Sequence, residues 1–535
     1  MDNIKQTTIL NPPDAARIMD GLRDTGYDFN TAIADIVDNS IAANASVVYI
    51  HVDSDPNMNI TVSIADDGIG MDQDGLRNAM KYGSAERPNP NSLGKFGLGL
   101  KTASTAFCKK LSVISRPEPG ADILKVCWDL DHIAEVNEWE LLSIEPSEDD
   151  IDLLEQAADG KSGTVVTWEK VDRLFQRAYA SQRNEKKALE RYINNLRSHI
   201  ALVYQRFLDH TFEGASNIDI YLNDELVAPF DPFCSAEEKT DSMAEQTLEI
   251  NDGRAYMKIR AHLLPRKDEF SSKEAAAASR LGNDTQGFYI YREQRLIHSG
   301  DWLGMFKCEP HFSLLRIELA FDHDADEFLN VDIKKSRILL NEDIYGFIKD
   351  SYLPAFRREA ERRYRLGTSK QVAKTGKAPH ESANKTIDSK ASSVEKSKTT
   401  VVNEAKNEVQ VTNKNGVTKA HIKITTNSDK NACRVIPVET VDYNMLWDAT
   451  ITDEGKHAVL INMSHPFYQK VYYPLLSRST SVTGMDSLLW ALAEAELSSF
   501  NQESMDHFFD MKVEASRALA KLIEDLPDPN FDKDE

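Results

Sequence analysis

Apolar residues in the first third of the chain follow first a helical and then a strand-like spacing. Ile33, Ile36, Val37 and Ile41 recur three or four residues apart, which is typical of a helix with one buried face. Five later segments are rich in β-branched and aromatic residues, which indicates strands, at 46–52, 60–65, 111–115, 124–128 and 164–168. Most links between them are short, so the sequence predicts an antiparallel or mixed sheet within an α/β domain over residues 1–170.

A second region repeats this mixture of helix and strands. A long amphipathic helix is predicted at 185–208 and a closing helix at 345–366, with strands between them at 218–222, 256–263, 288–291 and 314–320. These elements predict an α+β domain over residues 171–366. The closing helix is basic, because it carries Arg357, Arg358, Arg362, Arg363 and Arg365. Such a run is either a solvated face or a contact for a phosphate backbone.

The composition changes after this helix. Residues 367–435 are rich in Lys, Ser, Thr and Asn and poor in aromatic residues, which predicts a disordered linker. Residues 436–535 regain Trp447, Tyr472 and Trp490 and show helical patterns at 487–499 and 505–522. From residue 438 onward there are 18 acidic against 7 basic residues, so a small acidic helical C-terminal domain is expected.

Overall composition narrows the class of protein. The 535 residues carry a net charge of -23, which argues against coating nucleic acid with the whole surface but allows a local basic groove. No run of about 18 apolar residues suggests a membrane span, and the first residues lack the pattern of a signal peptide. Five scattered cysteines form no zinc-type pair. We therefore expect a cytoplasmic protein with free thiols and no membrane contact.

One face of the first predicted helix carries candidate chemistry. At about 100° per residue, Asp35, Asp38, Asn39 and Ala42 fall on the side opposite the apolar residues. This face offers carboxylate and amide groups to a site, although solvent also accommodates such residues.

A glycine turn follows the strand 60–65. Asp66 stands at the strand end, where a carboxylate can accept a hydrogen bond from an exocyclic amine, and Gly68 and Gly70 allow a planar base to approach the backbone. A second glycine-rich segment runs from Gly94 to Thr102 into an apparent helix. Backbone amides at such a helix start, together with Lys95 and Lys101, suit a polyphosphate.

Two familiar phosphate motifs and a calcium loop do not fit these residues. Leu100 interrupts the P-loop pattern, and Thr102 stands where a dinucleotide fingerprint needs its third glycine. The run Asp322, Asp324, Asp326 lacks the glycine and the glutamate of a calcium loop, so we expect a solvated loop there.

Four segments, in order, resemble the ATP-site motifs of the GHKL superfamily, which includes gyrase, the ninety-kilodalton heat-shock chaperones, histidine kinases and MutL. They are Asp35 to Ser40, Asp66 to Met71, Gly94 to Lys101, and Gly163 with Thr164. The sequences of these motifs look closest to those of MORC-type ATPases and their bacterial relatives. The resemblance implies an α+β protein with a Bergerat-type α/β sandwich ATPase domain, followed by an α+β transducer domain and the small helical C-terminal domain.

The resemblance also implies ATP and Mg²⁺ as cofactors. Asn39 would coordinate magnesium, Asp66 would bind the adenine amine, and Thr164 would support the adenine end. Further nucleotide contacts are implied for Asp38, Gly68, Gly70 and Met71, and for the lid residues Gly94, Lys95, Phe96, Gly97, Leu98, Gly99, Leu100 and Lys101. Asp35 takes the place of the usual catalytic glutamate. Its side chain is one methylene shorter, and a misplacement near 1 Å can cost about 100-fold in rate, so slow hydrolysis is compatible with the sequence.

Transducer domains of this superfamily usually send a lysine to the γ-phosphate. Lys335 is the leading candidate and Lys334 the second. The expected function is an ATPase whose N-terminal domains dimerise on nucleotide binding and clamp or remodel a partner, with DNA as a candidate and bacterial defence as a candidate setting. The acidic C-terminal domain could recruit a protein partner. The alternative is a nucleotide-dependent scaffold or chaperone with little hydrolysis, whereas a histidine kinase or a topoisomerase fits the domain order poorly.

Overall fold

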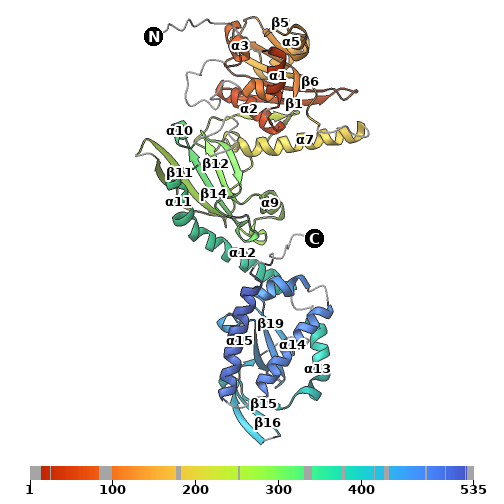
Figure 1. The fold of residues 1–535 in the computed structure, drawn as a ribbon, viewed down its shortest axis with the longest axis vertical. Helices are drawn as coiled ribbons and strands as arrows, with labels where there is room; N and C mark the ends of the chain where they lie inside the picture. The colour runs from red at the N-terminus through yellow and green to blue at the C-terminus, as the bar shows by residue number, and fades with distance from the viewer. Residues whose placement is uncertain are drawn as a thin grey trace, which may run out of the picture. The chain divides into compact units, whose positions relative to one another are not determined.

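The computed structural model describes residues 14–24, 26–83, 99–175, 182–250, 253–329, 340–375, 380–414, 416–426, 433–475, 479–499, 502–524 and 526. The chain forms two compact units (Figure 1), one of residues 1–308 and 315–356 and the other of residues 309–314 and 357–535. Within the described residues, no helix is long and apolar enough to cross a membrane.

An eight-stranded sheet forms the centre of the N-terminal domain. Its strands are β1 (Val47–Ser54), β2 (Ile60–Asp66), β3 (Cys108–Arg116), β4 (Leu124–Asp129), β5 (Leu142–Ile144), β6 (Gly163–Val171), β7 (Asp219–Leu222) and β8 (Glu225–Leu226). They are ordered β5-β4-β3-β6-β2-β1-β7-β8, and all neighbours are antiparallel except β1 and β7. The predicted mixed sheet is confirmed.

Helices cover both faces of this sheet. One face packs against the helices α1 (Ala15–Arg23), α2 (Phe29–Ala42) and α7 (Gln182–Val203), which share one apolar core with it. The other face packs against α6 (Glu148–Ala158). Successive side chains of a strand point to opposite faces of the sheet, so Val48 and Ile50 of β1 belong to the first core while Tyr49 packs against the second. The result is the α/β sandwich expected from the sequence.

The segment 218–222 corrects the predicted domain division. Sequence patterns predict this strand in the second domain, but β7 pairs in parallel with β1 and extends the first sheet. Ile220 and Leu222 are buried in the core of the N-terminal domain. A strand that crosses between predicted domains cannot be assigned from periodicity alone, because its apolar pattern fits either sheet.

The second sheet belongs to the same unit. It contains β9 (Asp241–Ser242), β10 (Gln246–Ile250), β11 (Ala255–Leu263), β12 (Gly287–Arg292), β13 (Arg295–Gly300) and β14 (Leu315–Phe321). The order is β10-β11-β14-β12-β13, with β9 beside β11. The short helix α8 (Gln205–Leu208) joins the two sheets, because Arg206 pairs with Glu318 of β14 and its guanidinium lies 3.6 Å from the ring centroid of Tyr291 on β12.

The acidic run 322–326 was predicted to be a solvated loop, but part of it is buried. Asp326 is buried and accepts two hydrogen bonds from Arg292, from Nε at 2.7 Å and from Nη2 at 2.8 Å. The sequence prediction failed because the arginine that neutralises this carboxylate lies 34 residues away in the chain.

Helix follows the second sheet, as predicted for 345–366. The structure contains α11 (Glu342–Gly346), a π-helical segment (Phe347–Tyr352) and α12 (Leu353–Thr375). Glu342 to Phe356 belong to the first unit and the rest of α12 to the second.

The predicted linker is wrong over much of 367–435. Residues there form α13 (Glu381–Val394) and the antiparallel strands β15 (Lys398–Asn403), β16 (Glu408–Asn413) and β17 (Gly416–His421). Ala383, Ile387 and Ala391, four residues apart, are buried in the core of the C-terminal unit. Three small or medium apolar side chains at helical spacing suffice here, because α14 (Ser479–Leu497) and the strands beneath it supply the rest of the core.

The C-terminal domain is also not purely helical. Strands β18 (Ile424–Thr425), β19 (Val435–Val438), β20 (Trp447–Thr452) and β21 (His457–Asn462) form a sheet in the order β18-β20-β21-β19. Helix α14 (Ser479–Leu497) packs on β20 and β21, and α13 packs beside α14 (Figure 1). Helices α14 and α15 (Gln502–Leu522) confirm the two predicted helices, and the whole unit is α+β.

Candidate ATP-binding site

Helix α2 carries the predicted catalytic and metal-binding residues. Its start is fixed by Asp28, whose side chain accepts hydrogen bonds from the backbone amides of Asn30 and Thr31. Asp35 is buried, and its Oδ2 accepts a hydrogen bond of 2.9 Å from the Tyr27 hydroxyl. The carboxylate predicted to act as the base is therefore held in a defined orientation.

Asn39 lies one helical turn beyond Asp35 and is half-buried. Its Nδ2 donates to the backbone oxygen of Asp35 at 3.0 Å. The side chain thus uses its nitrogen for the helix, and an amide oxygen is a hard ligand of the kind that Mg²⁺ takes. The residue type and placement of Asn39 fit the predicted metal contact.

Asp66 closes the site at the end of β2. Its Oδ2 accepts from the Ser40 hydroxyl at 2.7 Å and its Oδ1 from the backbone amide of Gly68 at 3.0 Å. Burial raises the pKa of Asp66 to about 6, while these hydrogen bonds oppose the rise. A carboxyl group with this pKa is largely ionised at neutral pH and can accept a hydrogen bond from an amine.

The glycines after Asp66 are needed for close packing. Gly70 has a φ of +65°, and a Cβ there would lie 2.0 Å from the backbone oxygen of Arg116. A Cβ on Gly68 would lie 2.8 Å from the Cβ of Ala43. The turn therefore rests directly on β3 and on the end of α2, which fixes the position of Asp66.

Ser115 of β3 ties this turn to β6. Its hydroxyl accepts from the Met71 amide at 2.9 Å, donates to the Gly163 oxygen at 2.8 Å, and lies 2.9 Å from Oγ1 of Thr164. Thr164 also pairs with Asp66 across the β2–β6 ladder. Asp66 and Met71 of one motif are thus brought together with Thr164 of another.

Helix α4 (Gly99–Thr105) supplies the last described part of the predicted lid motif. A Cβ on Gly99 would lie 3.6 Å from Oδ2 of Asp35, so the start of α4 packs beside the predicted base. Leu100 is half-buried against the N-terminal core. The remaining lid residues Gly94, Lys95, Phe96, Gly97 and Leu98, and the lysines Lys334 and Lys335, lie outside the described residues.

Lys101 has a structural contact that the motif does not indicate. Its buried ammonium donates to the backbone oxygens of Ala79 at 2.9 Å and Lys81 at 2.8 Å. These carbonyls end the helix α3 (Gln73–Met80), so Lys101 caps that helix. Its predicted contact with phosphate stays a prediction.

Asp38 faces the second sheet. Its Oδ1 accepts from the Tyr204 hydroxyl at 2.7 Å and from Nε of Arg295 at 2.9 Å. Arg295 lies on β13, and both members of the ion pair are buried. The helix that carries Asp35 and Asn39 is thereby bonded to the neighbouring sheet.

Three residues of the site were missed by sequence reasoning: Tyr27, Ser40 and Ser115. Ser40 directly follows Asn39, so its place within the first motif was an available signal. Tyr27 and Ser115 lie outside the motifs. Their contacts depend on the tertiary fold, and no spacing rule points to them.

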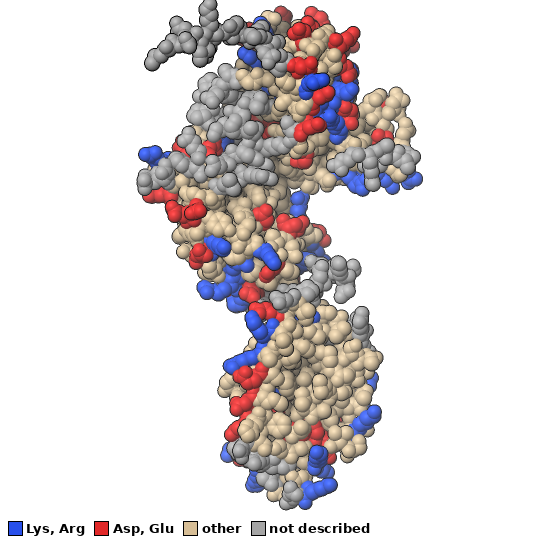
Figure 2. All heavy atoms as spheres, in the orientation of Figure 1, with Lys and Arg blue, Asp and Glu red and all other residues tan. Residues whose placement is uncertain are grey.

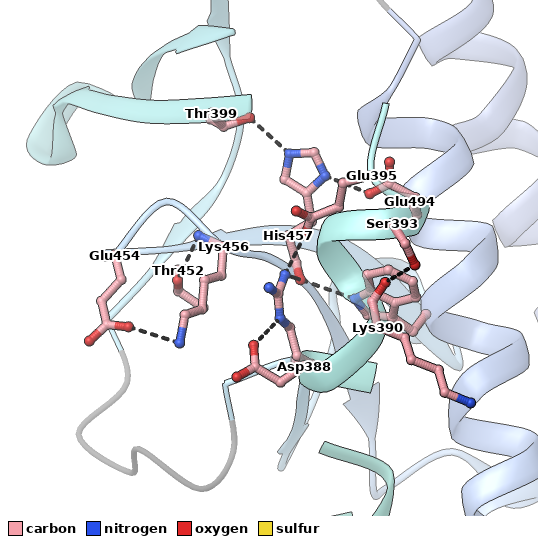
Figure 3. Close-up of polar contacts among 12 residues, drawn as sticks. Asp388, Lys390, Ser393, Glu395, Thr399, Thr452, Glu454, Lys456, His457 and Glu494 are labelled. Carbon is pink, nitrogen blue, oxygen red and sulfur yellow. Dashed lines mark hydrogen bonds and ion pairs between the residues drawn. The ribbon is translucent and has the colours of Figure 1, made fainter. Parts of the chain in front are cut away.

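A candidate metal cluster in the C-terminal unit has a different explanation. Ligand atoms of Glu395, His457 and Glu494 lie within 4.8 Å of one another (Figure 3). However, His457 already contacts Glu494 through Nδ1 at 2.6 Å and Thr399 through Nε2 at 2.8 Å. Glu395 is paired with Arg434, which also binds the backbone oxygen of His457. An arginine thus supplies the positive charge, and the cluster connects the end of α13 and the residue before β19 with β21 and α14.

Comparison with known proteins agrees with the geometry of the N-terminal site. Residues 27–164 match the family model described as "Histidine kinase-, DNA gyrase B-, and HSP90-like ATPase". This segment contains Asp35, Asn39, Asp66 and Thr164, and it marks a GHKL-type ATPase domain.

The other comparisons add little. A crystal structure of the N-terminal domain of a DNA repair protein is similar at 17% identity over 65% of this chain and 98% of that chain, with a TM-score of 0.39. That score is too low to support an argument. The comparison with curated proteins finds no match.

Proposed function

We propose that the N-terminal domain binds Mg-ATP between α2, the turn after β2, and β6, and hydrolyses it. The observation that carries this proposal is the position of Asp66, a buried carboxyl group bonded to Ser40 of α2 and paired with Thr164 of β6. Asp66 would accept the adenine amine, and Asn39 would hold the magnesium ion, which supplies positive charge to the phosphates.

Asp35 would take a proton from the attacking water. The Tyr27 hydroxyl fixes the carboxylate through Oδ2, and Gly99, the first described residue of the predicted lid, packs against the same side chain. Asp35→Ala should lose hydrolysis while retaining Mg-ATP binding, and Asp35→Glu tests whether the longer side chain improves turnover. If Asp35→Ala hydrolyses ATP as fast as the wild type, Asp35 is not the base.

Calorimetry with Mg-ATP tests the site itself. Asn39→Ala and Asp66→Asn should each weaken binding, and Tyr443→Phe, at an exposed tyrosine of the other unit, should not. Unchanged affinity in both site variants would overturn the proposed site. Binding with negligible turnover in the wild type would favour the alternative of a nucleotide-dependent scaffold or chaperone.

We further propose that nucleotide binding brings two N-terminal domains together as a clamp. Support comes from the GHKL-type segment, since ATPases of this kind commonly dimerise. DNA is the candidate partner, with the exposed Arg358 and Arg362 of α12 as contacts, although Arg362 also pairs with Glu359. Light scattering without nucleotide, with ADP and with a non-hydrolysable ATP analogue, each with and without DNA, tests the clamp. An unchanged mass in all six samples would count against it.

The C-terminal unit is a candidate protein-binding domain. On the face shown in Figure 2, acidic side chains lie along one edge of this unit, beside a broad area free of charged residues. This uncharged surface fits a protein partner better than a nucleic acid, and Leu488 of α14 is a further apolar side chain that is 61% exposed.

A further inference from the structure

A buried ion pair between Asp38 and Arg295 connects the ATP-site helix α2 to the second sheet. Asp38 stands directly before Asn39, yet its carboxylate contacts Tyr204 and Arg295. Burial alone would lower the pKa of Arg295, and the Asp38 carboxylate raises it above the usual value. Arg295 therefore remains charged, and loss of either side chain would leave the other buried without its partner.

Tyr204 makes the same connection from another element. Its hydroxyl lies 2.7 Å from Asp38 Oδ1 and 2.6 Å from the backbone oxygen of Ala34. Tyr204 directly precedes α8, where Arg206 pairs with Glu318 of the second sheet. Two residues that are two positions apart thus contact the ATP-site helix and the second sheet, respectively.

We propose that Arg295 and Tyr204 are positioning residues of the ATP site, which fix Asn39 and Asp35 through Asp38 and transmit nucleotide occupancy to the hairpin of β12 and β13. This inference rests on the proposed ATP-binding function. Asp38 and Asn39 are adjacent on one helix, and a shift of α2 moves both. A movement of α2 on nucleotide binding must therefore either carry the hairpin with it or break a buried ion pair.

The same hairpin offers a matched control. Arg292 is as deeply buried as Arg295, pairs with the buried Asp326, and faces Arg295 across the hairpin. It does not contact α2 in the described hydrogen bonds and ion pairs. Loss of either arginine leaves one buried carboxylate without its cation, so both variants should destabilise the fold, but only Arg295 should affect the nucleotide site.

The experiment measures Mg-ATP affinity by calorimetry for the wild type, Arg295→Gln, Tyr204→Phe and Arg292→Gln. Arg295→Gln and Tyr204→Phe should weaken binding about tenfold, the effect of one lost hydrogen bond, while Arg292→Gln stays close to the wild type. Tyr204→Phe removes only a hydroxyl group, so it decides the question if Arg295→Gln does not fold.

Hydrogen exchange provides a readout independent of turnover. In the wild type, Mg-ATP should slow exchange in β13, and Tyr204→Phe should reduce that protection. Equal losses of affinity in Arg292→Gln and Arg295→Gln, or affinity unchanged in Tyr204→Phe, would overturn this inference while wild-type binding upholds the proposed function. Failure of the wild type to bind Mg-ATP would overturn both.

Discussion

At the residue scale, Asp66 is buried, whereas its proposed role in binding adenine needs an ionised carboxylate. Its pKa of about 6, raised by burial from 3.8, means that the folded protein holds a proton there at pH values where the unfolded chain has lost it. The contribution of Asp66 to the free energy of unfolding is therefore fully present below pH 3.8 and is lost as the pH rises through about 6.

Nucleotide affinity should follow the opposite trend. In the proposed site the Asp66 carboxylate would accept the adenine amine best when ionised, so the wild type should bind Mg-ATP more tightly as the pH rises through about 6. Asp66→Asn should bind weakly without this step. Because the triphosphate itself titrates, the measurement is the difference between the two affinity profiles, and parallel profiles would contradict the prediction.

Gly70 gives a second prediction at this scale. Gly70→Ala should lower the free energy of unfolding by about 3 kcal/mol or more, since it combines a positive φ with a contact to the Arg116 backbone. Gly120→Ala is the control, because Gly120 has a φ of +78° and open space around its Cβ position. It should lose only about 1 kcal/mol. Equal losses in urea unfolding would show that the contact to β3 is not decisive.

At the element scale, substitution of Lys101 tests its helix-capping role by stability and its predicted phosphate contact by affinity. Lys101→Met should destabilise the protein by about 2 kcal/mol, because the carbonyls of Ala79 and Lys81 lose a charged donor in a buried place. Lys109→Met removes only a partly exposed pair with Asp131 and should cost less than about 1 kcal/mol.

Nucleotide affinity then shows whether Lys101 has a second role. A loss of Mg-ATP affinity in Lys101→Met beyond that of an equally destabilised variant would support the phosphate contact implied by the motif. A thermal midpoint equal to that of Lys109→Met would contradict the capping role.

The helix and strands around the site could be predicted because their patterns are local. The apolar spacing of Ile33, Ile36 and Val37 gave α2, and β-branched runs gave β1, β2 and β6. Asp38 shows the limit of such reasoning, since its pattern places it on the same face as Asp35. Its partners Tyr204 and Arg295 lie 166 and 257 residues away, and only the tertiary fold brings them together.

At the scale of the whole molecule, the segment 380–426 is either a linker or part of the folded C-terminal unit. Its polar composition suggested a linker, but Val409 and Val411 of β16 and Ile387 of α13 are buried in the C-terminal core. Composition misled because few apolar residues are needed when α13 packs against the large helix α14.

Limited proteolysis of the full chain tests this assignment. Ile387→Asp should expose the segment to cleavage and lower the thermal midpoint, because it places a carboxylate in the core. Val394→Asp, on the same helix but 48% exposed, should behave like the wild type. Equal cleavage of both variants and the wild type throughout this segment would favour the linker after all.

The parallel pairing of β7 with β1 also affects how the first domain can be made. The matched family segment stops at residue 164, yet the edge of β1 is not covered until residues 219–222 have been synthesised. A fragment that ends with β6 would leave that edge exposed to strands from other molecules, which promotes aggregation. During translation, α7 and β7 must therefore be synthesised before the sheet of the N-terminal domain is complete.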